Sequence, residues 1–421
     1  MQIEPLKLFV WLGSQLKIGS MMSFANVPSS IRQYLIVTGN YWAFTLTDGA
    51  LRMLVVLYFH QLGFGALKIA MLFLFYEVFG VITNLVGGWL GARFGLNKTM
   101  NVGLGVQIIA LSMLLVPSSM LTVVWVMAAQ ALSGIAKDLN KMSAKSAIKM
   151  LVPENAENTL FKWVAILTGS KNALKGVGFF LGGFLLTAFG FQKVIFIMLV
   201  GLAAVWLLSL VLLKGEIGKS LSKPKFAEIF SKNQSINVLS GARLFLFGAR
   251  DVWFVVALPV YLSQTLGWEH WLTGTFFACW VIGYGVIQSL APVITGAKLG
   301  KVPTGLSAVI WASVLSVLTA LITVAVFFNY QTTVTLIAGL ILFGAVFAMN
   351  SSIHSYLIVS YAKSDNVSMD VGFYYMANAM GRLIGTVLSG LLFQQYGLTA
   401  CLFASTVFLV LASFISIKLP R

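Results

Sequence analysis

Charged side chains interrupt otherwise apolar runs of this chain, and their spacing predicts a site that binds anions. Residues 134–151 read GIAKDLNKMSAKSAIKML and place Lys137, Lys141 and Lys145 four residues apart, along one slowly drifting face of a helix. Lysine offers a mobile point charge and arginine a planar fork, and both bind carboxylate or phosphate oxygens. The segment fits the wall of a wet, cationic path. For Lys145, the positive-inside bias and snorkelling at a membrane surface are the simpler explanation.

Other apolar segments carry deep charges of the same kind. An ionisable side chain inside a bilayer costs about 2.5–3.5 kcal/mol on insertion scales, so such residues normally face a cavity or a partner. The cations predicted to bind substrate are Arg52, Lys137, Lys141, Lys171, Lys175, Arg243, Arg250 and Arg382. The predicted charge-pair or coupling residues are Asp48, Glu77, Asp138, Asp251 and His354. Because the eight cations outnumber the four acids, an anionic substrate would neutralise the excess.

Structural roles stay open for several of these residues. Asp48 and Arg52 stand four residues apart and are well placed to pair on one helix face. Asp138 is placed to neutralise Lys141 or Lys137 in the same way. Glycines on the helices that carry the deep charges are predicted close-packing sites, namely Gly178, Gly182, Gly183, Gly381, Gly385 and Gly390.

The composition places these charges in a membrane protein. The 421 residues are 59% hydrophobic and 10% charged, whereas soluble domains carry about 25% charged residues. Runs such as VIFIMLVGLAAVWLLSLVLL supply the roughly 20 apolar residues that a spanning helix needs, and the strand alternation of outer-membrane proteins is absent. We therefore predict an all-α polytopic membrane protein.

Net charge and cysteine usage exclude other classes of protein. The net charge of +16 is attributed to membrane topology rather than to a nucleic-acid partner. Cys279 and Cys401 both lie in apolar runs, so no disulfide, metal site or other cofactor is predicted. A membrane-embedded enzyme would need a convergent nucleophile, base or metal cluster, and the three histidines show no metal-ligand spacing.

Turn signals divide the chain into twelve predicted transmembrane spans. These are 34–60, 66–91, 99–116, 120–149, 161–189, 194–213, 236–264, 271–297, 304–328, 333–362, 368–396 and 398–418. The polar stretch 214–235 is predicted to be a cytoplasmic linker between six-helix halves at 34–213 and 236–421. Residues 1–33 are expected to be an N-terminal extension, and a start codon assigned too early is one explanation for them.

Lysine and arginine in the loops predict the orientation of the chain. One set of loops holds Arg93, Lys98, Lys149, Lys214, Lys219, Lys223, Lys225, Lys232, Lys298, Lys301, Lys363 and Lys418. The opposite set holds little beyond Lys68 and Lys193. We expect the first set and both termini to be cytoplasmic, in the lipid bilayer of a bacterial inner membrane.

The two halves resemble each other in sequence. Lys175–Gly178 aligns with Arg382–Gly385 at an offset of 207 residues, and Gly91–Gly95 aligns with Gly296–Gly300 at an offset of 205. Near-constant offsets predict a parallel repeat of six spans, so that the halves are pseudo-symmetric. This is the architecture of the major facilitator superfamily, whose site lies between the halves and which works by alternating access. Lys175 and Arg382, one from each half, are expected to clamp the anion.

One loop carries a further resemblance to this superfamily. The segment GGWLGARFGLNK at 87–98 resembles the loop between its second and third helices, and Arg93, Gly95 and Lys98 keep the pattern. Ala92 stands where that loop usually carries an acid. The salt bridge that the loop usually contributes to gating therefore lacks its carboxylate.

Longer segments resemble a narrower family. They are NYWAFTLTDGALRMLVVLYFHQLG (40–63), NLVGGWLGARFGLNKT (84–99), QALSGIAKDLNKMSAKSAIK (130–149), LTGSKNALKGVGFFLGG (167–183) and LFLFGARDVWFVVALPVYL (244–262). Together they resemble the ArsJ-type organoarsenical efflux permeases, from about residue 31 to the C-terminus. The resemblance implies export of 1-arseno-3-phosphoglycerate, which a glyceraldehyde-3-phosphate dehydrogenase makes from arsenate, and thereby arsenate resistance.

The residues by themselves leave two other transporter classes open. An organophosphate/phosphate exchanger fits the cationic cavity equally well, whereas a drug:proton exporter predicts a more apolar cavity with a few acids. The coupling mode is open too, because uniport, phosphate exchange and proton antiport through Asp48, Glu77 or His354 all fit the residues.

Overall fold

The computed structural model describes residues 29–63, 72–153, 155–213, 217–220, 224–226, 230, 233–296 and 302–421. Within these ranges the chain is helical and contains no strand. The helices are α2 (Ser29–Gln61), α4 (Leu74–Phe94), α5 (Leu96–Met113), η2 (Ser118–Met120), α6 (Val123–Leu151), α7 (Glu157–Phe189), α8 (Phe191–Leu212), α9 (Gln234–Phe254), α10 (Ala257–Gln264), α11 (His270–Ile294), α12 (Gly305–Phe327), α13 (Thr332–Tyr361), η5 (Ser364–Asn366) and α14 (Val367–Ser416). Predictions outside the described residues concern 1–28, Lys68, Lys214, Lys223, Lys232, Lys298 and Lys301.

Each predicted span contains a helix, which confirms the all-helical fold. The last two predicted spans form one element, α14, whose backbone turns at Gly397 with a φ of 76° that glycine tolerates. The seventh span is divided into α9 and α10. Among the described residues, eight helical segments are long and apolar enough to cross a membrane, and α4, α5 and the charge-rich α6 are not among them. The number of crossings stays a prediction.

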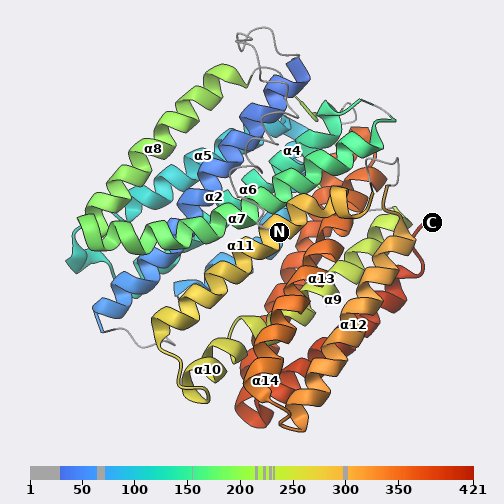
Figure 1. Ribbon diagram of the computed structural model, residues 1–421. Helices are drawn as coiled ribbons and strands as arrows, with labels where there is room; N and C mark the ends of the chain where they lie inside the picture. The colour runs from blue at the N-terminus through green and yellow to red at the C-terminus, as the bar shows by residue number, and fades with distance from the viewer. Residues whose placement is uncertain are drawn as a thin grey trace, which may run out of the picture.

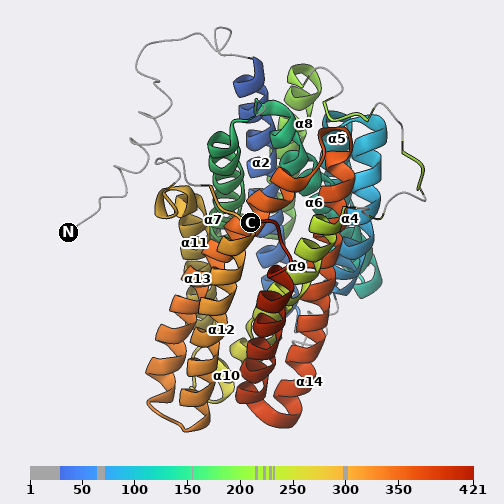
Figure 2. The ribbon, with the colours of Figure 1, turned by 90° about the vertical axis from the view of Figure 1, so that its right-hand side faces the viewer.

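The helices form two groups that lie side by side (Figure 1). Helices α2 to α8 lie on one side of this view and are called the first group, and α9 to α14 lie on the other side and are called the second group. Between the groups, α4 packs against α14 and α7 packs against α11. Figure 2 shows the long helices running roughly parallel. The end of the bundle where α6 ends and α9 begins is called the linker end, and α10 lies toward the opposite end.

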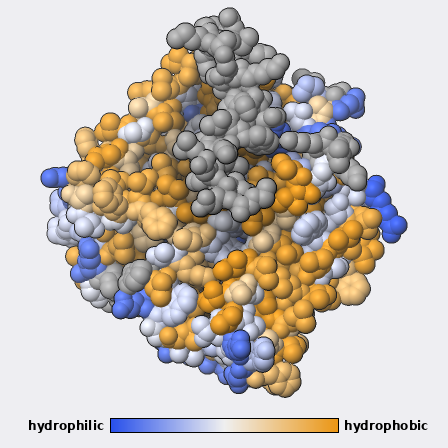
Figure 3. Space-filling view, viewed as in Figure 1, coloured by the Kyte–Doolittle hydropathy of each residue, from blue (hydrophilic) through white to orange (hydrophobic). Residues whose placement is uncertain are grey.

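The outer face of the bundle is apolar. Figure 3 shows a face on which hydrophobic side chains predominate, with hydrophilic ones mainly toward the rim of the view. Bulky side chains such as Val124, Phe184 and Phe327 are 76%, 68% and 65% exposed. Water would penalise this surface strongly, whereas the hydrocarbon of a bilayer does not. The chain is therefore a multi-pass membrane protein.

Glycines allow the two helix groups to touch near the linker end. A Cβ added at Gly88 of α4 would lie only 2.6 Å from the carbonyl oxygen of Ser368 in α14. In the second contact, a Cβ added at Gly169 of α7 would overlap the carbonyl oxygen of Gly285 in α11. Both contacts are backbone on backbone, so any larger residue would force the groups apart.

The described part of the linker fastens the same end. Leu96 N donates to the carbonyl of Ile217, and Ser220 N donates to the carbonyl of Ala92, each at 2.8 Å. The Ser220 hydroxyl also donates to Asp365 Oδ1 at 3.2 Å, in the second group. Ala92 stands where the family's loop has an acid, and here the linker backbone connects this loop to the other helix group.

The contact at Gly169 gives a first prediction. Gly169→Leu inserts a side chain into a filled interface, and overpacking of this kind typically costs about 1–3 kcal/mol. We expect a lower thermal unfolding midpoint in detergent than for Gly201→Leu on α8, whose Cβ would meet nothing within 4 Å. Equal midpoints for the two variants would contradict the close contact between α7 and α11.

Candidate functional site

Five charged side chains form one ion-pair network where α2, α4, α9 and α14 meet. Glu77 Oε1 lies 3.1 Å from Arg52 Nη2 and 3.0 Å from Arg382 Nη2. Arg382 Nε also donates to Asp251 Oδ2 at 3.1 Å, and Arg250 binds the other oxygen of Asp251. We call these five residues the carboxylate network. It joins the two helix groups, because Arg52 and Glu77 belong to the first group and the other three residues to the second.

Close helix packing brings the second-group members of this network together. A Cβ added at Gly385 of α14 would lie 2.6 Å from the carbonyl oxygen of Gly248 in α9, and one added at Gly381 would overlap the carbonyl of Leu244. The predicted close packing is confirmed at Gly178, Gly182, Gly381 and Gly385. It is wrong for Gly183 and Gly390, which have no close backbone neighbour among the described residues.

The expected pair of Asp48 with Arg52 is not formed within the described ranges. Asp48 Oδ1 instead accepts a hydrogen bond of 2.8 Å from the hydroxyl of Tyr76. The guanidinium of Arg52 lies over the Tyr76 ring, 4.7 Å from its centroid, while it binds Glu77. A pair four residues apart on a helix contributes only about 0.2–0.5 kcal/mol, so partners from a neighbouring helix readily displace it.

Asp138 neutralises lysines of its own helix, as the sequence indicated. Its carboxylate lies 2.6 Å from Lys141 Nζ and 3.9 Å from Lys137 Nζ. The Lys137 ammonium also lies 3.7 Å from the centroid of the Tyr76 ring. Tyr76 therefore connects α6 with the carboxylate that Asp48 presents on α2.

Three deep lysines have no acidic partner in the part of the chain that the structure describes. Lys145 Nζ donates to Thr168 Oγ1 at 2.7 Å, and Lys171 Nζ donates to Asn172 Oδ1 at 3.3 Å. The Lys175 ammonium lies 5.9 Å from the centroid of the Phe179 ring, and the Asp48 carboxylate attracts it only at longer range. Neutral partners solvate these ammonium groups but leave their charge uncompensated.

Arg243 is held by neutral groups in the same way. Its Nε donates to Asn378 Oδ1 at 2.9 Å, and its Nη1 donates to the carbonyl and hydroxyl oxygens of Ser351. The guanidinium stacks on Phe247 at 3.9 Å from the ring centroid. No acid pairs with it among the described residues. Lys145, Lys171, Lys175 and Arg243 are called the uncompensated cations below.

The uncompensated cations lie close enough to repel one another or the other cations of the site. Lys171 repels Lys145 and Arg382, and Lys175 repels Lys171 and Arg382. Lys145 in turn repels Arg243, across the boundary between the helix groups. An anion between the groups would meet positive charge from both.

Side-chain exposure falls toward the linker end. Along α6, Lys137 and Lys141 are 14% and 13% exposed, whereas Lys145 is 3% exposed. Along α9, Arg250 is 15% exposed and Arg243, nearer the linker end, is 3% exposed. Glu77 and Arg382 in the carboxylate network are each 26% exposed. Solvent therefore reaches this site from the opposite end.

Polar contacts between the helix groups agree with a closed linker end. Lys149 Nζ donates to the carbonyl of Ser360 at 3.2 Å, and the Tyr356 hydroxyl donates to Glu157 Oε2 at 2.7 Å. Among the described residues, the hydrogen bonds and ion pairs between the two groups lie at the linker end or midway along the helices. The contact farthest from the linker end is that of Glu77 with Arg382.

Some residues near these cations were not among the predicted site residues. Lys145 was attributed to a membrane surface, although it is buried between the groups and lies 5.1 Å from the Tyr375 ring centroid. Tyr375, Asn378 and Arg382 are spaced i, i+3 and i+7, and this pattern on one helix face was the available signal. His354 is buried, and its Nδ1 has no partner among the described groups.

The predicted clamp of Lys175 and Arg382 stays a prediction. The two side chains interact electrostatically, and both lie near mid-length of their helices. Arg382 is, however, already paired with Glu77 and Asp251, whereas Lys175 forms no ion pair in the described part of the chain and meets Asp48 and Glu77 only at longer range. A ligand would have to compete for Arg382 but not for Lys175.

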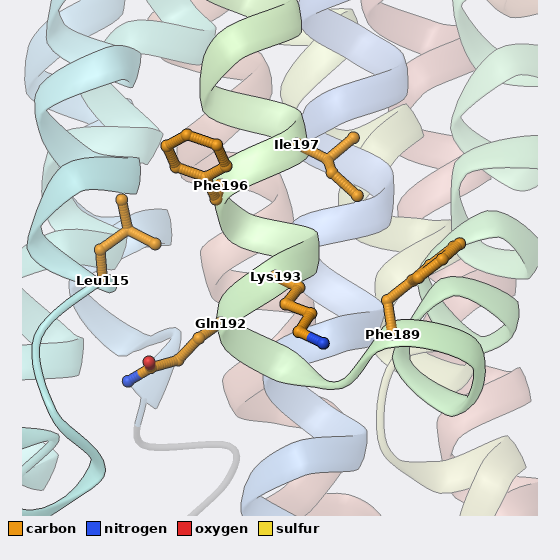
Figure 4. A pocket seen from close by; sticks show the side chains of 6 residues that line it. All are labelled: Leu115, Phe189, Gln192, Lys193, Phe196 and Ile197. Carbon is orange, nitrogen blue, oxygen red and sulfur yellow. The ribbon is translucent and has the colours of Figure 1, made fainter.

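A groove on the outer face contains none of these residues. It has a volume of about 450 Å³ and lies between the ends of α5 and α7 and the start of α8 (Figure 4). Its lining consists of Leu115, Phe189, Gln192, Lys193, Phe196 and Ile197. With one cation and mostly apolar walls, it does not match the anion chemistry of the interior.

Comparison with known proteins assigns the family. The model of the Major Facilitator Superfamily matches residues 37–328 and 244–421, so the chain belongs to this superfamily of membrane transporters. A search of curated proteins gives no match. Membership of the superfamily makes the chain a transporter by class.

Solved structures share the fold. The human organic anion transporter MFSD10 (TETRAN) superposes with a TM-score of 0.73 at 14% identity, covering 93% of this chain and 100% of that one. A bacterial homologue of the iron transporter ferroportin, in its outward-facing state, also gives 0.73 at 14% identity, covering 91% and 98%. At this identity the likeness concerns the fold alone.

The carboxylate network gives a second prediction. Asp251 is fully buried and serves two arginines, so Asp251→Asn leaves a buried guanidinium without its counter-charge. Breaking a buried ion pair typically costs about 3–5 kcal/mol. We expect the thermal midpoint in detergent to fall clearly below that of Glu269→Gln, which changes an exposed carboxylate at the start of α11. If both variants melt like the wild type, Asp251 does not hold the network together.

Proposed function

We propose that this chain is a secondary transporter that exports an organoarsenical anion, 1-arseno-3-phosphoglycerate, from the cytoplasm and so confers arsenate resistance. The substrate class follows from the uncompensated cations, which is the observation that carries the proposal. The particular substrate rests on the resemblance of residues 40–63, 84–99, 130–149, 167–183 and 244–262 to the ArsJ-type permeases.

The chemistry of the proposed substrate suits the site. The molecule has three carbons, with a phosphate at one end and an acyl arsenate at the other, and both ends are anionic. Lysine ammonium groups adapt to such oxygens as point charges, and the arginine fork binds them through two parallel N–H groups. Lys171 and Lys175 on α7 and Arg382 on α14 would bind it from the two helix groups. Pentavalent arsenic needs such donors rather than thiolates.

The orientation is part of the proposal. Cations at the linker end include Arg93, Lys98 and Lys149 in terminal helix turns and Lys363 between α13 and η5, so the positive-inside rule favours a cytoplasmic linker end in a bacterial inner membrane. With that orientation, the closed end is cytoplasmic and the site faces outward, ready to release an anion.

Export of an anion needs no coupling ion in this scheme. Each negative charge that leaves a cell with an inside-negative potential gains about 2.3 kcal/mol per 100 mV. A multivalent anion therefore leaves downhill by uniport, and rocking of the two helix groups supplies alternating access. An organophosphate/phosphate exchanger is the alternative, and it differs in substrate and in its need for a counter-anion.

The third prediction tests the substrate and the cationic site together. Everted membrane vesicles would receive arsenate, glyceraldehyde-3-phosphate, NAD and the dehydrogenase outside, and arsenic inside would be measured. We expect uptake that requires the dehydrogenase. In Lys175→Gln and Arg382→Gln the half-saturating concentration should rise about tenfold or more, because a hydrogen bond to a charged group contributes about 1.5–3 kcal/mol.

A matched control separates site effects from general loss of charge. Lys193→Gln removes an exposed lysine at the start of α8, in the outer groove, and should transport like the wild type. Uptake with arsenate alone would show that the substrate is wrong. Unchanged uptake in both site variants would show that the site is wrong. Exchange of phosphate for a sugar phosphate, with no arsenic uptake, would favour the organophosphate exchanger.

A further inference from the structure

Glu77 holds a position that a substrate oxygen would otherwise fill. Its Oε1 lies about equally far from one guanidinium of each helix group, at 3.1 Å from Arg52 and 3.0 Å from Arg382. Arginines bind phosphate and carboxylate oxygens with this contact geometry. Within the described residues, Glu77 with Arg382 is also the one ion pair that joins the two groups.

The two acids of the carboxylate network differ in their access to solvent. Glu77 is 26% exposed, whereas Asp251 is fully buried against Arg250 and Arg382. An incoming anion can therefore exchange with Glu77 but not with Asp251. Displacement of Glu77 would leave Arg382 with Asp251 on one side and the ligand on the other.

Arginine makes this counter-charge necessary when the site is empty. A guanidinium stays charged in proteins, so Arg52 cannot lose a proton when the helix groups close around it, whereas a desolvated lysine can. Closing an empty site around an arginine without a counter-anion is therefore costly. Arg52 has Glu77 as its acidic partner within the described part of the chain, and Arg382 shares Glu77 with Asp251.

We propose that Glu77 is the internal counter-anion of the empty carrier. The substrate displaces its carboxylate from Arg52 and Arg382, and the carboxylate returns when the substrate leaves. The empty protein then changes conformation without an anion bound, so transport is net movement rather than obligatory exchange. This inference rests on the proposed anion transport and assigns net transport, rather than obligatory exchange, as its mechanism.

The test compares net uptake with exchange in proteoliposomes that contain the full chain. Outside, the dehydrogenase, NAD and glyceraldehyde-3-phosphate act on radiolabelled arsenate. The lumen contains either buffer, for net uptake, or the same mixture with unlabelled arsenate, for exchange. Wild-type protein should take up label in both settings.

Glu77→Gln should retain exchange while its ratio of net uptake to exchange falls about tenfold or more, in line with the loss of a charged hydrogen bond. Its half-saturating concentration in exchange should fall too, because no internal carboxylate competes with the substrate. Glu77→Asp keeps the charge and should restore part of the net uptake. Glu269→Gln, an exposed carboxylate outside the site, should match the wild type in both settings.

The outcomes separate the two proposals. A wild-type ratio in Glu77→Gln overturns the counter-anion role while leaving anion transport intact. Loss of both modes in folded Glu77→Gln and Glu77→Asp also overturns it, because exchange needs no empty carrier. If wild-type protein moves label in neither setting, the proposed substrate fails and the role of Glu77 fails with it.

Discussion

Excess positive charge inside an apolar bundle is the constraint on which the rest of this structure depends. The carboxylates of Glu77, Asp138 and Asp251 form ion pairs with Arg52, Arg250, Arg382 and the first two lysines of α6. Lys145, Lys171, Lys175 and Arg243 are left to hydroxyl, amide and aromatic partners. Ionisable residues inside a membrane normally face a cavity or a partner, and the proposed anionic substrate would be that partner.

Packing and charge cooperate at the boundary between the helix groups. Glycines let α4 contact α14 and α7 contact α11. At the linker end, the backbone N–H of Ser220 in the linker donates to the carbonyl of Ala92 in α4. Midway along the helices, the ion pair of Glu77 with Arg382 is added to the glycine contacts between α7 and α11. The linker end is therefore held by close backbone contacts, and the centre is held by glycine contacts together with an ion pair that is partly exposed.

Much of this arrangement can be predicted from the residue types and their spacing along the chain. Apolar runs of span length determine the helices, and repeat offsets of 205 and 207 residues predict two similar halves. The deep charges stand out because each costs free energy in a bilayer. Short-range spacing also located the Asp138 pairs correctly, since residues three apart on a helix are neighbours wherever the helix packs.

The sequence by itself determined the helical membrane fold, the repeat and the surplus of cations. Only the tertiary structure decided the partner of each charge. Their spacing predicted an ion pair of Asp48 with Arg52. In the structure Tyr76 binds Asp48 and Glu77 binds Arg52, and both partners come from another helix. Lys145 was predicted to lie near the membrane surface because its position was judged from its distance to the end of α6. In the structure α7 packs over it, and Thr168 accepts its hydrogen bond. Side-chain pairing across helices depends on interhelical distances of a few ångströms, which residue spacing within one helix does not contain.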